Sequence, residues 1–185
     1  AVLEAAQAGG NLPGPYDFRA YRCETYSVAT NKPPFAPYRG VARPGVCFAI
    51  ELTIDAIARA VGREPLDVRA ENLVQAGAMP YTNVTGKHYD SGDYPESLRA
   101  VQDLIGFRAV RERQLRPEPD GRLVGVGFAT YTEQSAHGTK VFAAWGLPLV
   151  PGFEQATVKL TPDGGLEVRA GIQTIGQGLE TTLAQ

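Results

Sequence analysis

The feature that most constrains the fold is a change in the spacing of apolar residues near position 120. Over residues 46–61 apolar side chains recur every three or four positions, which predicts an amphipathic helix that ends at Gly62. Beyond position 121, short apolar runs bounded by turn residues predict strands. We therefore expect an α+β fold, helix-rich over residues 1–120 and built of antiparallel strands over residues 121–185.

Two further helices are predicted between positions 62 and 107, and a third follows them. A proline in the first turn marks the start of each one, at Pro65 and at Pro95. The first is expected to reach Gly77, and the long segment 76–94 that follows is expected to be irregular. The charged run 108–116 predicts a solvated helix. The inner face of the helix that starts at Pro95 is expected to hold Leu98, Val101 and Leu104.

The predicted strands are rich in β-branched and aromatic residues. The pair nearest the C-terminus is separated by Thr161-Pro162-Asp163-Gly164-Gly165, in which Pro presets one φ angle and Asp-Gly tolerates positive φ, so we expect an antiparallel hairpin. The predicted strands are residues 16–31, 123–131, 154–160 and 166–174.

Composition excludes several classes of protein. The chain of 185 residues has 18 basic and 20 acidic side chains without a basic stripe, which argues against a surface dedicated to nucleic acid or to an anionic membrane. No apolar run approaches the roughly twenty residues of a membrane span. The N-terminal residues lack the pattern of a signal peptide, so we expect a cytoplasmic location.

The two cysteines predict neither a disulfide framework nor a metal site. Cys23 and Cys47 are far apart and lie outside any C-x-x-C pattern or histidine-rich context. We expect both to be buried free thiols and assign no metal ligand.

A first candidate ligand site is the loop over residues 38–45. The prolines at 33, 34 and 37 should hold an extended segment that delivers Tyr38-Arg39-Gly40 to a fixed place ahead of a strong helix. Guanidinium groups and backbone amides there could meet an anion. The alternative is that these arginines make only surface salt bridges.

A second candidate is Gly176-Gln177-Gly178, between a predicted strand and a helix-like segment that begins at Leu179. Two glycines allow close backbone approach, and amides at a helix N-terminus suit a phosphate or pyrophosphate. The alternative is a plain tight turn. The helix has no capping residue before Gln185, so we expect the chain to be a piece of a longer protein.

The order of motifs resembles the molybdenum-binding large subunit of the xanthine dehydrogenase and aldehyde oxidase family. The resemblance begins with Tyr38-Arg39-Gly40-x-x-Arg43-Pro44 and ends with Gly176-Gln177-Gly178-x-x-Thr181. Between them lie Phe48-Ala49-Ile50-Glu51, Asp67-x-Arg69-x-x-Asn72-Leu73, Met79-Pro80-Tyr81 and Tyr89-Asp90-Ser91-Gly92. The resemblance assigns residues 1–120 to the end of a first molybdopterin-binding domain and residues 121–185 to the start of a second.

The resemblance implies a molybdenum hydroxylase that binds molybdopterin and oxidises an aldehyde or an N-heterocycle with water as oxygen source. Electrons would leave through iron–sulfur clusters to FAD on partner subunits or domains. The cofactor would carry the redox chemistry, and the protein would bind, orient and tune it. The alternative function is a catalytically incomplete structural or assembly fragment that does not bind cofactor alone.

The resemblance also assigns site residues. It places Arg39 beside the metal and the substrate as a catalytic residue, and it makes Arg39, Gly40 and Val41 cofactor-binding residues. The second loop would bind the pterin through Ile175, Gly176, Gln177 and Gly178, and both loops are expected to face one cleft.

Two departures from the family pattern limit the choice of substrate. Where aldehyde- and purine-oxidising relatives often place a phenylalanine this chain has Val41, which weakens any claim for xanthine. Where carbon monoxide-oxidising relatives carry a cysteine it has Gly40, which argues against carbon monoxide. The general base of the family would lie outside this sequence.

Overall fold

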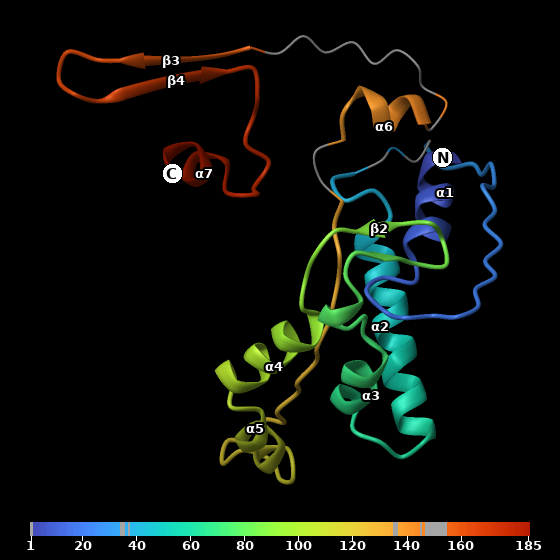
Figure 1. Ribbon diagram of the computed structural model, residues 1–185. Helices are drawn as coiled ribbons and strands as arrows, with labels where there is room; N and C mark the ends of the chain where they lie inside the picture. The colour runs from blue at the N-terminus through green and yellow to red at the C-terminus, as the bar shows by residue number, and fades with distance from the viewer. Residues whose placement is uncertain (1, 34–35, 37, 135–136, 145, 147–154) are drawn as a thin grey trace. The chain divides into compact units, whose positions relative to one another are not determined.

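The computed structural model describes residues 2–33, 36, 38–134, 137–144, 146 and 155–185. Contacts within the chain divide it into two units, Ala1–Glu133 and Gln134–Gln185. The first unit holds most of the helices, and the second holds a two-stranded hairpin (Figure 1). The predicted α+β class is therefore confirmed. None of the helices in the described ranges is long and apolar enough to cross a membrane.

The longest helix, α2 (Arg43–Ala60), is the axis of the first unit. It begins earlier than predicted and ends as predicted. Gly62 takes a φ of 65° there. The Arg63 amide donates to the Ala58 carbonyl at 2.9 Å and the Gly62 amide donates to the Arg59 carbonyl at 3.2 Å. This pair of bonds is a Schellman motif, which satisfies carbonyls left free at a helix end.

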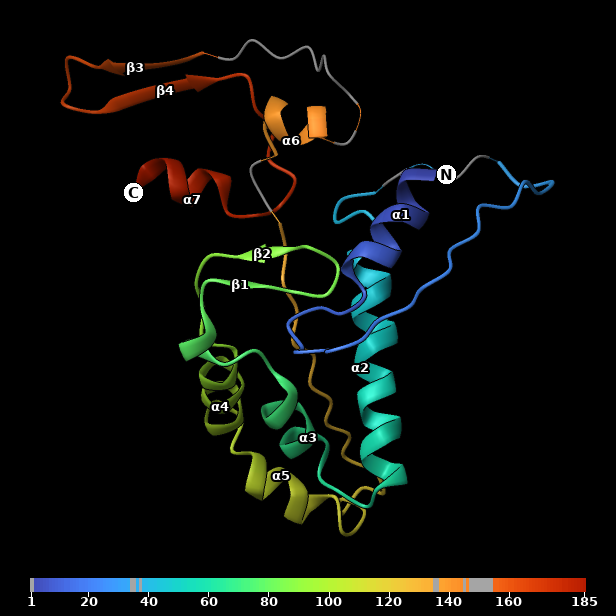
Figure 2. The same cartoon turned by 45° about the vertical axis from the view of Figure 1, so that its right-hand side comes forward.

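The hydrophobic core lies where α2 meets α3 (Pro65–Asn72) and α4 (Tyr94–Leu104), while α1 (Val2–Asn11) also contacts α2 (Figures 1 and 2). The core side chains come from all three helices and from the segments that flank them. They are Tyr16, Ile54, Ala58, Leu66, Val68, Leu73 and Leu98, with Phe18, Ile50, Tyr94, Phe107 and Phe128 packed against them.

A buried ionic network runs through this core. The Arg69 guanidinium, only 1% exposed, donates at 2.7 Å to Glu51 and at 2.7 Å to Asp55. It also donates to the Phe128 carbonyl at 3.2 Å, and the Tyr16 hydroxyl donates to Glu51 at 2.6 Å. Burial and the Glu51 carboxylate raise the pKa of Tyr16 well above its usual value. Because each buried charge has a partner, the network fixes α2 against α3 and against the segment at Phe128.

The segment 76–94, predicted to be irregular, contains a short 3₁₀ helix, η1 (Ala76–Ala78), and a small antiparallel hairpin of β1 (Tyr81–Thr82) and β2 (His88–Tyr89) (Figure 2). The Asn83 side chain stabilises the turn by accepting from the amides of residues 85 and 87 at 3.0 and 2.9 Å. The Tyr89 hydroxyl donates to the Gly14 carbonyl at 2.8 Å. The hairpin is thereby tied to the loop that follows α1.

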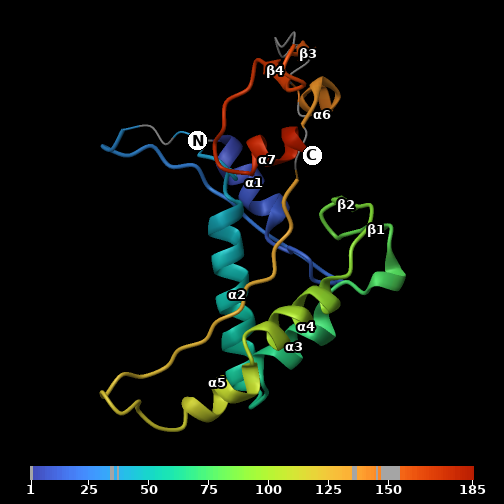
Figure 3. The same ribbon diagram turned by 90° about the vertical axis from the view of Figure 1, so that its left-hand side faces the viewer.

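The helices after this hairpin only partly match the prediction. The Asp93 side chain caps α4 by accepting from the Glu96 amide at 2.9 Å. Of its predicted inner face only Leu98 is buried, whereas Val101 and Leu104 are exposed. After Leu104 the chain turns into α5 (Phe107–Arg113) (Figure 3). Val101 is left 45% exposed and Leu104 85% exposed. The charged run 108–116 is helical as far as Arg113, and residues 114–116 lie outside the helix.

Two predicted strands are absent, and one helix is shorter than predicted. Over residues 16–31 the structure has one isolated bridge, between Tyr16 and Leu73, and the rest of this segment is mostly exposed without a ladder partner. Residues 123–131 are extended but make no ladder, and Phe128 is fixed instead by Arg69. Helix α3 stops at Asn72 because Val74 leaves it to donate to the Pro15 carbonyl at 2.9 Å.

The cysteines are both free, and one of them is not where we expected it. Cys47 is half-buried, but Cys23 is exposed. The expectation of burial is wrong for Cys23 because its segment, predicted to be a strand, lies at the surface.

The second unit confirms the predicted hairpin. Strands β3 (Ala156–Leu160) and β4 (Leu166–Ala170) pair antiparallel with Leu160 opposite Leu166. The loop between them has Gly164 at a φ of 85°, as its Asp-Gly sequence indicated. Helix α6 (Thr139–Ala144) precedes the hairpin and α7 (Leu179–Ala184) follows it.

Candidate functional site

The first candidate loop has an unusual backbone. Its residues Gly40, Val41 and Ala42 take φ angles of 93°, 34° and 64° immediately before α2 begins. The Val41 amide donates to the Tyr38 carbonyl at 2.8 Å, and the Arg43 amide donates to the Gly40 carbonyl at 3.1 Å. Left-handed backbone is costly for residues with a Cβ and is found where surrounding contacts enforce it, often at functional sites. Arg39 stands exposed on this loop.

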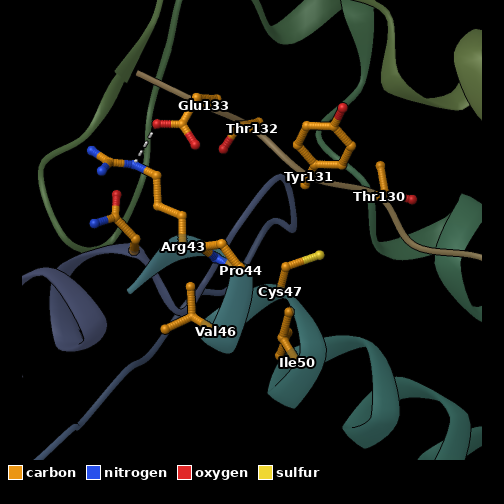
Figure 4. Close-up of a pocket in the computed structure, with 10 residues that line it drawn as sticks. Arg43, Pro44, Val46, Cys47, Ile50, Thr130, Tyr131, Thr132 and Glu133 are labelled. Atoms are coloured by element: carbon orange, nitrogen blue, oxygen red, sulfur yellow. Dashed lines mark ion pairs between the residues drawn. The ribbon is translucent and has the colours of Figure 1, made fainter. Parts of the chain in front are cut away.

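The neighbouring Arg43 turns inward and is 8% exposed. Its Nη1 donates to the Gly40 carbonyl at 3.1 Å, and its Nε lies 3.2 Å from Glu133 Oε1 (Figure 4). Its Nη2 is buried and has no hydrogen-bond partner. The first turn of α2 is thus joined by one side chain both to the loop before it and to the last residue of the first unit.

A pocket of about 270 Å³ lies beside Arg43 in the first unit. Helix α2 forms one wall and residues 130–133 form the other, with Cys47 and Ile50 pointing between them (Figure 4). Burial and the Glu51 carboxylate raise the pKa of the Cys47 thiol, so this thiol stays protonated near neutral pH. The pocket therefore offers an apolar wall with a cation at one end.

The charge near Arg43 is biased toward positive. The half-buried Lys87 has its pKa lowered, first by burial and then by repulsion from Arg43. The amino end of α2 adds a partial positive charge. Glu133 is the anionic partner that the structure gives to Arg43.

The second candidate loop repeats the backbone pattern in the second unit. Gly176, Gln177 and Gly178 have φ angles of 98°, 54° and 71° directly before α7. The Gly178 amide donates to the Gly176 carbonyl at 2.7 Å, and Gly178 then accepts from the Thr182 amide at 2.9 Å. All three residues and Ile175 are exposed. The predicted turn before a helix is confirmed, and it lies at the surface.

The site residues predicted from sequence thus fall into two groups. Arg39, Gly40 and Val41 lie together on one loop of the first unit, and residues 175–178 lie together on one loop of the second. Among the described residues no cluster of three or more His, Cys, Asp or Glu side chains could hold a metal ion.

Sequence reasoning missed three charged residues of the first loop's surroundings. Arg43 stood within the Arg-Pro motif, but nothing in the pattern showed that it turns inward while Arg39 stays exposed. Glu133 and Lys87 lie far from the loop in sequence. A signal was available only for Arg43, because a cation in the first turn of a helix is electrostatically unfavourable and needs a partner.

Comparison with protein families identifies both parts of the chain. Residues 2–73 match one molybdopterin cofactor-binding domain family, and residues 100–185 match a second one of the same description. The two matches lie on either side of the β1–β2 hairpin. Each contains one of the two candidate loops.

Individual relatives agree with this assignment. The nicotine 6-hydroxylase large subunit of Paenarthrobacter nicotinovorans is 31% identical over 97% of this chain, and the carbon monoxide dehydrogenase large chain of Hydrogenophaga pseudoflava is 33% identical over 93%. The solved quinoline 2-oxidoreductase of Pseudomonas putida 86 matches 99% of the chain with a TM-score of 0.82 and 32% identity. The chain spans 22% of the length of both large subunits and 23% of the solved chain.

Proposed function

We propose that this chain, which belongs to the molybdenum-binding large subunits of the xanthine dehydrogenase and aldehyde oxidase family, contributes two loops to the molybdopterin site of a molybdenum hydroxylase. The observation that carries the proposal is that each matched molybdopterin cofactor-binding domain contains a run of three consecutive residues with positive φ directly before a helix. In this proposal the boundary between the two domains lies at residue 120.

The residues present fit such a cofactor. At Gly178 the space where a Cβ would stand is open, so a ligand can approach the backbone there. Gln177 is exposed and carries both a donor and an acceptor, which suits the polar edge of a pterin. On the other loop Arg39 offers an exposed planar fork of donors.

The roles follow from these donors. Ile175, Gly176, Gln177 and Gly178 hold the pterin, while Gly40 and Val41 shape the wall beside the reacting centre. Arg39 is the residue that stabilises developing negative charge at that centre. Molybdopterin, when bound, supplies the redox chemistry with water as the source of oxygen, and the chain's residues orient cofactor and substrate.

The substrate class is an N-heterocycle or an aldehyde. Two of the relatives carry nicotine or quinoline in their names, which supports a heteroaromatic substrate. Val41 leaves more room on the loop than the phenylalanine expected for purine oxidation, so the favoured substrate is one that needs no stacking ring at that position.

The electron path requires partners. We propose iron–sulfur and FAD subunits or domains, and a cytoplasmic location, as the family resemblance and the sequence imply. The competing proposal is that the 185-residue chain alone is an incomplete structural or assembly fragment. What favours it is length, since the chain covers only 22% of its large-subunit relatives and unpaired polar groups of a cofactor lower its affinity.

The test compares the isolated chain with the full-length subunit that contains it. Molybdenum and pterin are expected near one per full-length subunit and well below one per isolated chain. In the full-length enzyme, Arg39→Ala should lower kcat by about 100-fold, the loss typical of removing one electrostatic stabiliser. Arg39→Lys should restore little, because a point charge does not replace a fork.

The matched control is Arg59→Lys, at an exposed position on α2, which should leave kcat unchanged. A full-length subunit without pterin would refute the proposed function. An Arg39→Lys enzyme with normal turnover would instead remove Arg39 from the site and leave the family assignment intact.

A further inference from the structure

The loop over residues 40–42 needs an external support. Val41 and Ala42 both carry a Cβ, yet they take φ angles of 34° and 64°. Residues other than glycine avoid this region because the Cβ crowds the neighbouring carbonyl. Such backbone persists only where other contacts enforce it.

Two backbone hydrogen bonds close the loop, and one side chain fastens it. Arg43 Nη1 donates to the carbonyl of Gly40 at 3.1 Å, while Arg43 Nε is paired with Glu133 at 3.2 Å. The same guanidinium therefore contacts both Gly40, at the start of the strained segment, and Glu133, which is distant in the sequence. With 8% of Arg43 exposed, water competes poorly for its contact with the Gly40 carbonyl, whereas the Glu133 carboxylate is 43% exposed and its pairing with Arg43 is partly solvated.

Electrostatics around Arg43 favour a cation there only in the presence of Glu133. The amino end of α2 opposes a positive charge in its first turn. The half-buried Lys87 adds a second repulsive charge, and its ammonium pKa is lowered first by burial and then by repulsion from Arg43. The Glu133 carboxylate offsets both repulsions, so its pair with Arg43 holds this cation in the first turn of α2.

We propose that Arg43 is a positioning residue, which with Glu133 locks the left-handed loop 40–42 so that Arg39 and Val41 are presented in one fixed geometry. The inference rests on the proposed function, because it assigns Arg43 an effect on catalysis through Arg39. Arg43 itself touches neither substrate nor cofactor in this account.

The test uses the full-length enzyme with its partner subunits and two readouts. The first is amide hydrogen exchange in Arg43→Gln. The amides of Val41 and Arg43 should exchange at least about tenfold faster, since the loop loses its clamp, while the amides at residues 62 and 63 at the other end of α2 should keep their rates.

The second readout is turnover. Arg43→Gln should lower kcat about tenfold at unchanged molybdenum and pterin content. A double variant with Arg39→Ala should be no slower than Arg39→Ala alone, because Arg43 acts through Arg39. Arg43→Lys should not rescue, since an ammonium group lacks the rigid fork in which Nη1 contacts the Gly40 carbonyl while Nε pairs with Glu133. Arg59→Gln is the matched surface control.

Glu133→Gln keeps the shape of the Glu133 side chain and removes its charge. This variant replaces Arg43→Gln in the test if Arg43→Gln does not fold. It should reproduce the faster loop exchange to a smaller degree. Unchanged exchange at Val41, or equal acceleration throughout α2, would overturn the positioning role. Wild-type enzyme without pterin would refute the proposed function instead, while the exchange readout would still decide for or against the clamp.

Discussion

The loop before α2 and the loop before α7 share one backbone pattern and hold it by different means. Each places three consecutive residues at positive φ immediately ahead of a helix. In Gly176-Gln177-Gly178 two of the three residues are glycine, and all are exposed. In Gly40-Val41-Ala42 only the first is glycine, and Arg43 fastens the loop to Glu133.

The difference separates local from long-range control of a loop. Glycine accepts the left-handed region without steric cost, so the second loop follows largely from its own residues. Val41 and Ala42 resist that region, so the first loop depends on contacts with distant residues. Substitutions should therefore act locally in the second loop and spread through the first unit in the first loop.

The largest effect is expected for Gly40→Ala. Its φ of 93° is strained for alanine, and a Cβ would lie 3.0 Å from Pro44 Cδ. The free energy of unfolding of the first unit should fall by about 1–3 kcal/mol, measured by amide hydrogen exchange in α2. Gly45→Ala, with open space around it and inside the helix, is the control and should stabilise. Equal effects at both positions would mean that the loop is not tightly held.

A smaller loss is expected for Gly178→Ala. Its φ of 71° disfavours alanine, but nothing lies within 4 Å of the added Cβ. The loss should be about 1 kcal/mol and confined to α7, as seen by exchange of the Thr182 amide. Gly171→Ala is the control, since it has open space and no left-handed φ. If the stability of β3 and β4 also fell, the second loop would not be under local control, and the contrast with the first loop would be wrong.

A gain is expected for Ala42→Gly, which sharpens the comparison from the other side. Ala42 is the N-cap of α2 at a φ of 64° without a side-chain cap. Glycine should relieve that strain and stabilise the first unit by about 0.5–1 kcal/mol. The measurement is the denaturant midpoint of unfolding, followed through hydrogen exchange of the α2 amides. The same change at exposed Ala49, within the helix, should cost about 1 kcal/mol.

The smallest effect concerns pH and should be confined to the first unit. Burial and Arg43 lower the pKa of Lys87 from 10.5, so in the window just below 10.5 the unfolded chain binds more protons than the folded one. Stability of the first unit should therefore rise with pH through that window, from the lowered pKa upward. Lys87→Met should abolish this rise and slightly stabilise the unit at pH 7. A rise that persists in the variant would assign it to another group.

The sequence allowed correct prediction of elements whose cause is local. The end of α2 at Gly62, the β3–β4 hairpin and the turn at Gly176 all follow from glycine, proline and apolar spacing within a few residues. The segment 16–31 had strand composition, yet strands need partners, and among described residues it has only the bridge from Tyr16 to Leu73. The β-propensity of residues 16–31 alone did not reveal that the segment lacks a partner strand among the described residues.

The first candidate site was only half predictable for the same reason. The position of Arg39 on a loop before a helix could be inferred from the prolines and the helical pattern. The inward turn of Arg43 could not, because it depends on Glu133, ninety residues away in the chain numbering. The left-handed Val41 and Ala42 were equally hidden, since nothing in a valine or an alanine indicates positive φ.

The Arg69 network has a consequence for how the first unit comes apart. One guanidinium serves Glu51 and Asp55 on α2 and the carbonyl of Phe128, and it belongs to α3 itself. Separating α2 from α3 would leave Arg69 and Glu51 as unpartnered charges in an apolar interior, which is far costlier than losing a contact at the surface. Withdrawing the segment at Phe128 would leave one guanidinium N–H without its carbonyl acceptor. Partial opening is thereby penalised, so α2, α3 and the stretch around Phe128 should open as a single foldon. The ionic centre therefore couples the opening of these three segments.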